Sequence, residues 1–212
     1  MISKILKLIV PNALWHNLRE QKEKRLFKAW QVSDLQGPTP HIAKRNIIKE
    51  YQKKYGCLVL VETGTYRGDM VEAQKLTFKK VISIELGLKL FKNAQKRFIN
   101  DKNVVIMQGD SGRVLPIIMK DLVEPTIFWL DGHYSAGITA KGDKECPIFE
   151  ELDAIFQGKK LNHILLIDDA QSFNGSSDYP TIKQLTEYIK SKNPKYQIEV
   201  KHDVIRYVIA GS

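Results

Sequence analysis

Five short apolar runs rich in Val, Ile and Leu, each followed by an acidic residue, constrain the fold of this 212-residue chain most strongly. Such near-continuous runs are typical of strands that are buried on both faces of a parallel sheet. In open parallel sheets, ligands bind outside the carboxyl ends of the strands, which is where these acids would lie. The runs end at Glu62, Glu85, Asp110, Asp131 and the pair Asp168 and Asp169.

Segments with helical periodicity fill most of the gaps between these runs, which predicts an alternation of strands and helices. The alternation calls for a parallel sheet with right-handed crossovers. Only three residues separate the last two apolar runs, 196–200 and 204–209, so an antiparallel hairpin is expected there. The fold class is therefore α/β, with a Rossmann-like, doubly wound and mostly parallel sheet. The predicted helices cover residues 41–55, 69–78, 87–99, 145–157 and 181–191.

The sequence Gly-Pro-Thr-Pro at residues 37–40 interrupts the chain and predicts a domain boundary near residue 40. A chain of 212 residues is long enough for one well-buried α/β domain and short for two, since domains usually hold about 100 to 200 residues. We therefore expect a basic helical extension over residues 1–40 and one α/β domain over residues 41–212.

Positive charge is concentrated at the N-terminal end of the chain. Residues 1–55 hold 12 Lys and Arg against 4 Asp and Glu, which accounts for +8 of the formal net charge of +9. This excess is compatible with a nucleic-acid surface, an amphipathic element on an anionic membrane, or a solvated helix face. The helical spacing of large apolar side chains favours packing on the domain or on a second subunit over stacking on bases. These side chains are Trp15, Leu18, Leu26, Phe27 and Trp30.

Cysteine usage and apolar run length bear on location and partners. Cys57 and Cys146 are too few for a disulfide framework and lack the spacing of metal ligands, which predicts a reducing compartment and hence the cytoplasm. No run approaches the roughly 18 apolar residues that a membrane-spanning helix needs. We expect a small-molecule partner rather than nucleic acid, while peripheral membrane contact through the basic segment and a homo-oligomer stay open.

The most specific local motif follows the first predicted strand, where residues 62–68 read Glu-Thr-Gly-Thr-Tyr-Arg-Gly. Glycines let backbone N–H groups and the start of a helix approach a ligand closely, and the carboxylate can accept hydrogen bonds from that ligand. Glu85 ends the next run 23 positions after Glu62. Doubly wound folds place a ribose-binding acid at an interval of roughly 20 residues. The pattern predicts a nucleotide-type cofactor site.

Together with the Gly-Asp pair at 109–110 and the closing hairpin, this motif resembles the class I S-adenosylmethionine-dependent methyltransferases over about residues 56–210. The resemblance implies that the loop wraps the methionine and ribose of S-adenosylmethionine, that Glu85 binds the ribose hydroxyls, and that Asp110 flanks the adenine. The family commonly has a further glycine where this chain has Tyr66, so a bulkier loop that could cap the cofactor is expected. The implied cofactor-binding residues are Glu62, Gly64, Thr65, Tyr66, Gly68, Glu85, Asp110, Ser111 and Asp131.

A closer resemblance is to small metal-dependent O-methyltransferases of the catechol and macrocin types, in which acids after the fourth and fifth strands hold a divalent cation. It implies a Mg²⁺ ion bound by Asp131, Asp168 and Asp169. Carboxylate oxygens suit Mg²⁺, and a cation on the acceptor hydroxyl would lower the pKa of that hydroxyl. The alternative is that these three acids only cap helices or end strands.

Two residues of the glycine-rich segment 132–144 are candidates for catalytic proton transfer. His133 lies two residues after Asp131, and histidine has an unperturbed pKa of about 6.5, so it is the first candidate for a general base. Lys141 could instead deprotonate the acceptor or clamp an anionic one. The alternatives are a structural histidine and a solvated lysine. Glu150 and Glu151 are expected to face solvent or to cap a helix.

The function that these resemblances imply is metal-assisted methyl transfer from S-adenosylmethionine to a small hydroxylated acceptor such as a sugar. An NAD-dependent oxidoreductase would use a similar strand, turn and acid, although the complete G-x-G-x-x-G pattern is absent. An RNA methyltransferase would account for the basic extension. A noncatalytic protein that keeps the cofactor fold is the third alternative.

Overall fold

The computed structural model describes residues 12–33, 39–132 and 145–209. The chain divides into two compact units, residues 1–46 and 47–212. The first contains helix α2 (Asn12–Val32), in agreement with the helical spacing of its apolar residues, and the start of helix α3 (His41–Tyr55). Because α3 continues across the division, the domain boundary near residue 40 stays a prediction.

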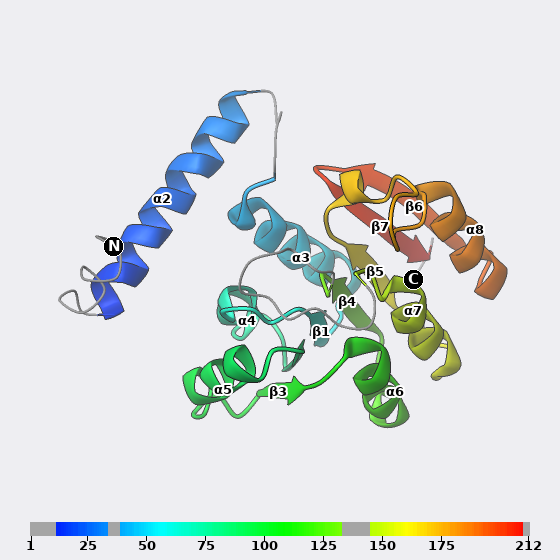
Figure 1. The fold of residues 1–212 in the computed structure, drawn as a ribbon, viewed down its shortest axis with the longest axis horizontal. Coiled ribbons are helices and arrows are strands. Elements are labelled where there is room, and N and C mark those ends of the chain that lie inside the picture. The colour runs from blue at the N-terminus through cyan, green and yellow to red at the C-terminus, as the bar shows by residue number, and fades with distance from the viewer. Residues whose placement is uncertain (1–11, 34–38, 133–144, 210–212) are drawn as a thin grey trace. The chain divides into compact units, whose positions relative to one another are not determined.

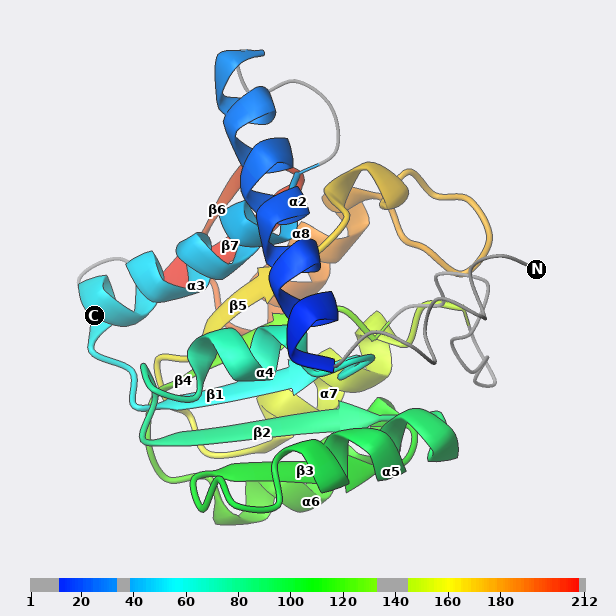
Figure 2. The ribbon, with the colours of Figure 1, turned by 90° about the vertical axis from the view of Figure 1, so that its left-hand side faces the viewer.

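The second unit is built on one sheet with strands β1 (Val59–Thr63), β2 (Lys80–Glu85), β3 (Val104–Gln108), β4 (Thr126–Leu130), β5 (Ile164–Ile167), β6 (Tyr196–Lys201) and β7 (Val204–Ile209). The strand order is β3-β2-β1-β4-β5-β7-β6, as Figures 1 and 2 show. Strands β1 to β5 are parallel, which confirms the prediction. The predicted hairpin is also present, since β7 pairs antiparallel with both β5 and β6.

Helices cover both faces of the sheet, as expected for a doubly wound fold. Buried side chains of α3, α4 (Asp69–Gln74) and the end of α5 (Leu88–Arg97) pack on one face, around Leu60 and Trp129. Helices α6 (Ser111–Asp121), α7 (Ile148–Gln157) and α8 (Ile182–Lys192) pack on the other, around Val61 and Phe128. Successive strand residues therefore alternate between two apolar layers, which explains why the central strands are apolar at almost every position.

Burial of each strand follows its position in the sheet. All positions of the central strands β1, β4 and β5 are buried. The edge strand β3 is only partly buried, and at the opposite edge Tyr196 is the buried residue of β6. Charged residues Glu199 and Lys201 occupy exposed positions of β6, where charge discourages pairing with another chain.

Helix α6 is an element that the sequence did not predict. Pro116 lies inside it, and proline removes a backbone donor and clashes with the preceding turn, at a cost of about 3 kcal/mol. The helix forms because Leu115, Ile118 and Met119 are buried in the core, and burying each such side chain stabilises by about 1.5 to 3 kcal/mol. Packing thus outweighs the local preference of this segment.

Candidate cofactor and acceptor site

The described residues predicted for the site lie together at the carboxyl edge of strands β1 to β5. This follows from the parallel arrangement, because each strand delivers the residues after it to the same edge. The chain builds outward from β1 through β2 to β3 and then crosses to β4 and β5 on the other side. The strand order therefore reverses between β1 and β4, where doubly wound sheets bind their ligands.

At two positions of the loop after β1, neighbouring atoms lie too close to leave room for a Cβ atom. Gly64 has φ +87°, and a Cβ there would lie 2.3 Å from the carbonyl oxygen of Asp131. Gly68 has φ +76°, and its Cβ would lie 2.5 Å from the ring of Phe98. The first contact brings the loop after β1 against the end of β4, and the second seats the start of α4 on the end of α5. Glycine is the residue that fits both positions.

Tyr66 stands where the related family commonly has glycine, and it adopts the glycine-like conformation with φ +50°. Its backbone N–H donates to Oε2 of Glu85 at 2.7 Å, while Oε1 of Glu85 accepts from the N–H of Gly87 at 2.8 Å. The Tyr66 side chain is 39% exposed. One carboxylate therefore fixes the loops that follow both β1 and β2, and it stabilises a conformation that is unfavourable for a non-glycine residue.

Glu62 lies beneath this loop in a chain of hydrogen bonds. The hydroxyl of Ser83 donates to Oε2 of Glu62 at 2.5 Å, and the hydroxyls of Ser83 and Thr65 are 2.6 Å apart. Burial raises the pKa of Glu62 to about 8, an effect that Ser83 opposes and that Glu85 and Asp69 reinforce. Burial likewise raises the pKa of Glu85, against the two backbone N–H groups that favour its charged form. Burial thus disfavours the charged form of both acids.

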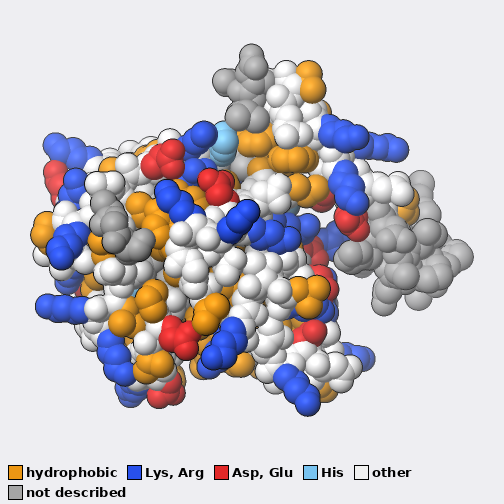
Figure 3. Space-filling view, turned by 180° about the vertical axis from the view of Figure 1, so that it is seen from behind, with side chains coloured by type: hydrophobic (Ala, Val, Ile, Leu, Met, Phe, Trp, Pro, Cys, Tyr) orange, Lys and Arg blue, Asp and Glu red, His pale blue; other side chains and the backbone are white. Residues whose placement is uncertain are grey.

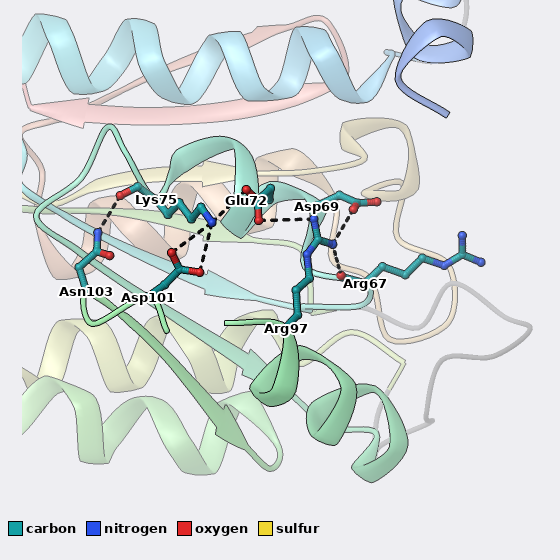
Figure 4. A network of polar contacts seen from close by, with 7 residues as sticks. All are labelled: Arg67, Asp69, Glu72, Lys75, Arg97, Asp101 and Asn103. Carbon is teal, nitrogen blue, oxygen red and sulfur yellow. Dashed lines mark hydrogen bonds and ion pairs between the residues drawn. The ribbon is translucent and has the colours of Figure 1, made fainter. Parts of the chain in front are cut away.

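Charged residues hold the loop and α4 onto α5, as Figure 4 shows. Nη1 of Arg97 donates to the carbonyl oxygen of Arg67 at 2.7 Å and to Oδ1 of Asp69 at 2.9 Å. Lys75 continues the network, with Nζ 3.0 Å from Glu72 and 3.1 Å from Asp101. The bond to the Arg67 carbonyl reaches the loop itself, so Arg97 is a positioning residue for the residues around Tyr66.

Asp110 and Ser111 are placed at the same edge, at the start of α6. Asp110 is the N-cap residue of α6, and Ser111 is buried. The preceding Gly109 has φ +141° and donates its N–H to the carbonyl oxygen of Glu85 at 3.0 Å. The end of β3 is therefore bonded to the end of β2, which brings Asp110 beside the loop of Glu85.

The acids after β4 and β5 are held by separate local hydrogen bonds. The N–H of Asp131 donates to Oγ1 of Thr63 at 3.1 Å, and the N–H of Asp168 donates to the Leu130 carbonyl at 3.1 Å. Asp168 is buried, and its Oδ1 accepts from the N–H of Asp169 at 2.9 Å. Asp169 has φ +52° and precedes the short helix η1 (Ala170–Ser172). Each acid therefore has a local structural role.

Across the described parts of the chain, no three His, Cys, Asp or Glu side chains lie together in a way that could hold a metal ion. Asp131 and Asp168 follow paired positions of β4 and β5, and Asp169 leaves the strand conformation with φ +52°. The arrangement therefore does not support the Mg²⁺ site expected from the resemblance, although these acids remain at the predicted strand ends.

Glu151 is a buried acid beside the site, and the expectation that it faces solvent was wrong. It is 2% exposed, and a Cβ on Gly132 would lie 2.7 Å from its Oε1. The sequence does carry a signal for this burial, because Glu151 falls on the same helical stripe as Ile148, Leu152 and Ile155. Ser83 and Thr63 are further site residues that the sequence analysis missed. Their roles depend on strand register, which pairs Glu62 with Ser83.

The two candidates for catalytic proton transfer, His133 and Lys141, lie outside the described residues. Their roles stay predictions. Both described ends of that connection do reach the carboxyl edge: Gly132 approaches Glu151, and the N–H of Glu145 donates to Oδ2 of Asp178 at 2.8 Å.

The sheet order and the placement of helices are similar to those of solved methyltransferases. The O-methyltransferase from Bacillus cereus, in complex with SAH, has a TM-score of 0.59 and 11% identity over 97% of this chain and 96% of that chain. The O-methyltransferase TomG from Streptomyces achromogenes, in complex with SAM, has a TM-score of 0.59 and 13% identity over 89% of each chain. This chain has the class I methyltransferase fold. The predicted Rossmann-like sheet with a closing hairpin is confirmed.

A nucleic-acid enzyme shares this fold as well. The 23S rRNA methyltransferase ErmE has a TM-score of 0.52 and 13% identity over 83% of this chain and 71% of that chain. No protein-family model matches the sequence, and no curated protein sequence does so either. The fold is therefore compatible with several acceptor classes, and the acceptor has to be argued from the residues of this chain.

On the face drawn in Figure 3, Lys and Arg side chains are scattered and interspersed with Asp and Glu rather than gathered into one patch. Within the described ranges, no helix combines the length and apolar character needed to cross a membrane. Cys57 and Cys146 are both buried and unbonded thiols, in keeping with the prediction that they form no disulfide.

Proposed function

We propose that this protein is an S-adenosylmethionine-dependent methyltransferase that methylates a hydroxyl group of a small acceptor such as a sugar. The observation that carries the proposal is the loop after β1, which Glu85 and Arg97 hold in a glycine-like conformation at the switch point of the sheet. A preformed loop of this kind loses little conformational entropy on binding a nucleotide-like ligand. The class I methyltransferase fold supports the assignment.

The residues around the loop would divide the work of holding the cofactor. Gly64, Thr65, Tyr66 and Gly68 would offer backbone groups and the Tyr66 ring, and Glu85 would accept hydrogen bonds from hydroxyl groups. Glu62 would provide negative charge beneath the loop when a cationic ligand favours its ionised form. Asp110 and Ser111, at the start of α6, would border the base. When bound, S-adenosylmethionine supplies the methyl group and a neutral thioether leaving group.

The acceptor half of the reaction needs positioning and removal of one proton. Asp131 follows β4 directly and would face the acceptor side of the switch point. His133 is the first candidate to take the proton from the acceptor hydroxyl, and Lys141 is the second. The two solved O-methyltransferases with this fold support oxygen as the acceptor atom.

Metal assistance stays a separate prediction. Asp131, Asp168 and Asp169 would supply the carboxylate oxygens, although their local hydrogen bonds do not favour a preformed site. A bound Mg²⁺ would supply Lewis-acid chemistry at the acceptor oxygen. Full activity in the presence of a chelator would remove the metal from the proposal without affecting methyl transfer itself.

Calorimetric titration with S-adenosylhomocysteine, with NAD and with a short RNA tests the assignment. We expect S-adenosylhomocysteine to bind with micromolar affinity whether or not Mg²⁺ is added, and NAD not to bind. Binding of NAD in place of the thioether would favour an oxidoreductase. Thioether binding that is accompanied by tight, salt-dependent RNA binding would instead favour a nucleic-acid acceptor, as in the ErmE enzyme.

A further inference from the structure

A groove of about 650 Å³ lies outside the cofactor loop, between the start of helix α7, the length of helix α8 and the segment that follows η1. Helices α7 and α8 lie side by side here, since Phe149 of α7 contacts Tyr188 of α8 (Figure 1). The third side is formed by the segment 175–180, which follows β5. The volume is within the range of small-molecule sites, about 300 to 1,000 Å³.

Aromatic side chains form the walls of this groove and are held in place by other rings. Tyr188 packs edge-to-face on Phe149 with ring centroids 4.9 Å apart. Tyr179 packs edge-to-face on Phe173 with centroids 5.5 Å apart. Both tyrosines are half-buried, and the hydroxyl of Tyr188 donates to Asp153, so Tyr188 contributes ring surface to the groove. Fixed aromatic faces of this kind bind rings at a low entropic cost.

The polar lining of the groove is acidic and amide-bearing rather than basic. Asp178, Glu187 and Gln184 line it, and none of the described residues that line it is Lys or Arg. Two lysines of α8 border this lining: Lys192 is 3.2 Å from Asp153 and lies over the ring of Tyr188, 4.9 Å from its centroid, and Lys183 is 3.9 Å from Glu187. In a chain with a net charge of +9, the described lining of this groove therefore carries carboxylate and amide groups and no Lys or Arg side chain of its own.

The groove adjoins the edge at which the methyl transfer would take place. Burial is the main cause that raises the pKa of Tyr179, and the charges of Cys146, Asp169, Glu145 and Asp131 act in the same direction. Asp169 and Asp131 follow β5 and β4, so the phenol that lines the groove also lies near two acids of the switch-point edge. The hydrogen bond from Glu145 to Asp178 joins the start of the α7 region to the same wall.

We propose that this groove binds the methyl acceptor and selects an uncharged hydroxylated ring compound, of the glycoside class, over phosphorylated or otherwise anionic ones. This inference rests on the proposed methyltransferase function. The tyrosine faces would cover the C–H face of the ring. Asp178 and Glu187 would accept hydrogen bonds from its hydroxyl groups. The amide nitrogen of Gln184 would donate to a ring hydroxyl, since its oxygen already accepts from Thr181. The two carboxylates would repel a phosphate.

Saturation-transfer NMR on protein saturated with S-adenosylhomocysteine tests this proposal. The probes are the methyl glycosides of glucose, galactose, mannose and rhamnose, each compared with a sugar phosphate, glucose 6-phosphate or mannose 6-phosphate. We expect at least one glycoside to bind at least tenfold more tightly than either phosphate. Ser191→Trp, which places a large ring in the groove, should weaken that binding at least tenfold.

Glu187→Lys should reduce the preference for the uncharged glycoside at least fivefold, because it adds a cation to the groove. Asp121→Lys, the same charge change at an exposed position of α6 away from the groove, should leave the preference unchanged. All variants should bind S-adenosylhomocysteine as the wild type does, which shows that they are folded and keeps this test separate from that of the cofactor site. Tighter binding of a sugar phosphate, or glycoside binding that Ser191→Trp leaves intact, would overturn the proposal.

Discussion

The two sides of the switch point are built differently. On the side of β1 and β2, Glu62, Ser83, Thr65, Tyr66 and Glu85 are joined by hydrogen bonds into one unit that fixes the loop. On the side of β4 and β5, Asp131, Asp168 and Asp169 are each bonded to nearby backbone or side-chain groups and do not converge on a common point. The first side therefore has the character of a preorganised ligand site, whereas the second supplies separate acids beside a groove.

This difference suggests a division of labour. A fixed loop can bind a cofactor that many enzymes share, because the shape of the cofactor is the same whatever the acceptor is. Acceptor recognition depends on the groove and on the connections after β4 and β5. Substitutions on each side test whether cofactor binding and acceptor recognition can be changed independently.

The largest effect is expected where the two sides touch. Gly64→Ala would place Cβ 2.3 Å from the Asp131 carbonyl oxygen, and two backbone segments would have to move apart. We expect a loss of about 3 kcal/mol or more in the free energy of unfolding, measured in urea. Gly56→Ala is the matched control, since Gly56 has φ +67° but no atom within 4 Å of the added Cβ. It should cost about 1 to 2 kcal/mol. Equal losses would show that the close approach is not important.

The second prediction concerns the buried acid of the β1 side. The pKa of Glu62 is raised from 4.5 to about 8 on folding, so the folded state binds more protons between these values and its stability falls as the pH rises. Burial lowers the pKa of His163 from 6.5 to about 4, which makes stability rise with pH below 6.5. Burial lowers the pKa of His202 as well, and since the histidine contributions fade above pH 6.5, Glu62 dominates the interval from pH 6.5 to 8.

Across that interval, wild-type stability should fall by about 2 kcal/mol in urea unfolding. Glu62→Gln should flatten this dependence, because the amide does not titrate. If the free energy of unfolding depends on pH equally in the wild type and in the variant, Glu62 is charged in the folded protein. Burial then does not raise its pKa as described.

The third prediction tests whether Glu85 holds the loop. In Glu85→Gln, the amide nitrogen would meet either the Tyr66 N–H or the Gly87 N–H, and one of these donors would lose its acceptor. We expect the affinity for S-adenosylhomocysteine to fall about tenfold, or about 1.4 kcal/mol, in a calorimetric titration. An unchanged affinity would separate the conformation of the loop from cofactor binding.

The smallest effect is expected on the β4 and β5 side. Asp168→Asn keeps an oxygen that can accept from the Asp169 N–H, so the affinity for S-adenosylhomocysteine should change less than twofold. If a metal takes part, Mg²⁺-dependent turnover with an acceptor should fall in this variant while cofactor binding persists. A large loss of S-adenosylhomocysteine binding would contradict the separation of the two sides.

The sequence predicted the parts of this molecule that follow from a repeated pattern. The five parallel strands were predicted because burial on both faces demands continuous apolar runs, and Glu62 and Glu85 were found because they end such runs. Helix α6 was not predicted, since Pro116 disfavours a helix locally and only the burial of Leu115 and its neighbours compensates. Local preference and tertiary packing disagree at this element.

The details of the site depend on register and side-chain direction, which a single sequence does not carry. Ser83 bonds Glu62 because β1 and β2 pair in the register that sets these residues side by side. Asp168 and Asp169 are neighbours in the sequence, but Asp169 turns into a left-handed conformation and donates its N–H to the Asp168 side chain. A metal site was expected from the resemblance to metal-dependent O-methyltransferases, and the described acids do not form a group that could hold a metal ion.

A crystal structure of the protein with S-adenosylhomocysteine and Mg²⁺ tests the central claim most directly. The account predicts adenosyl density between the loop of Gly64 to Gly68 and the carboxylate of Glu85, with the thioether sulfur directed toward Asp131. Density for the ligand elsewhere on the molecule, or an empty loop at saturating ligand, would contradict it.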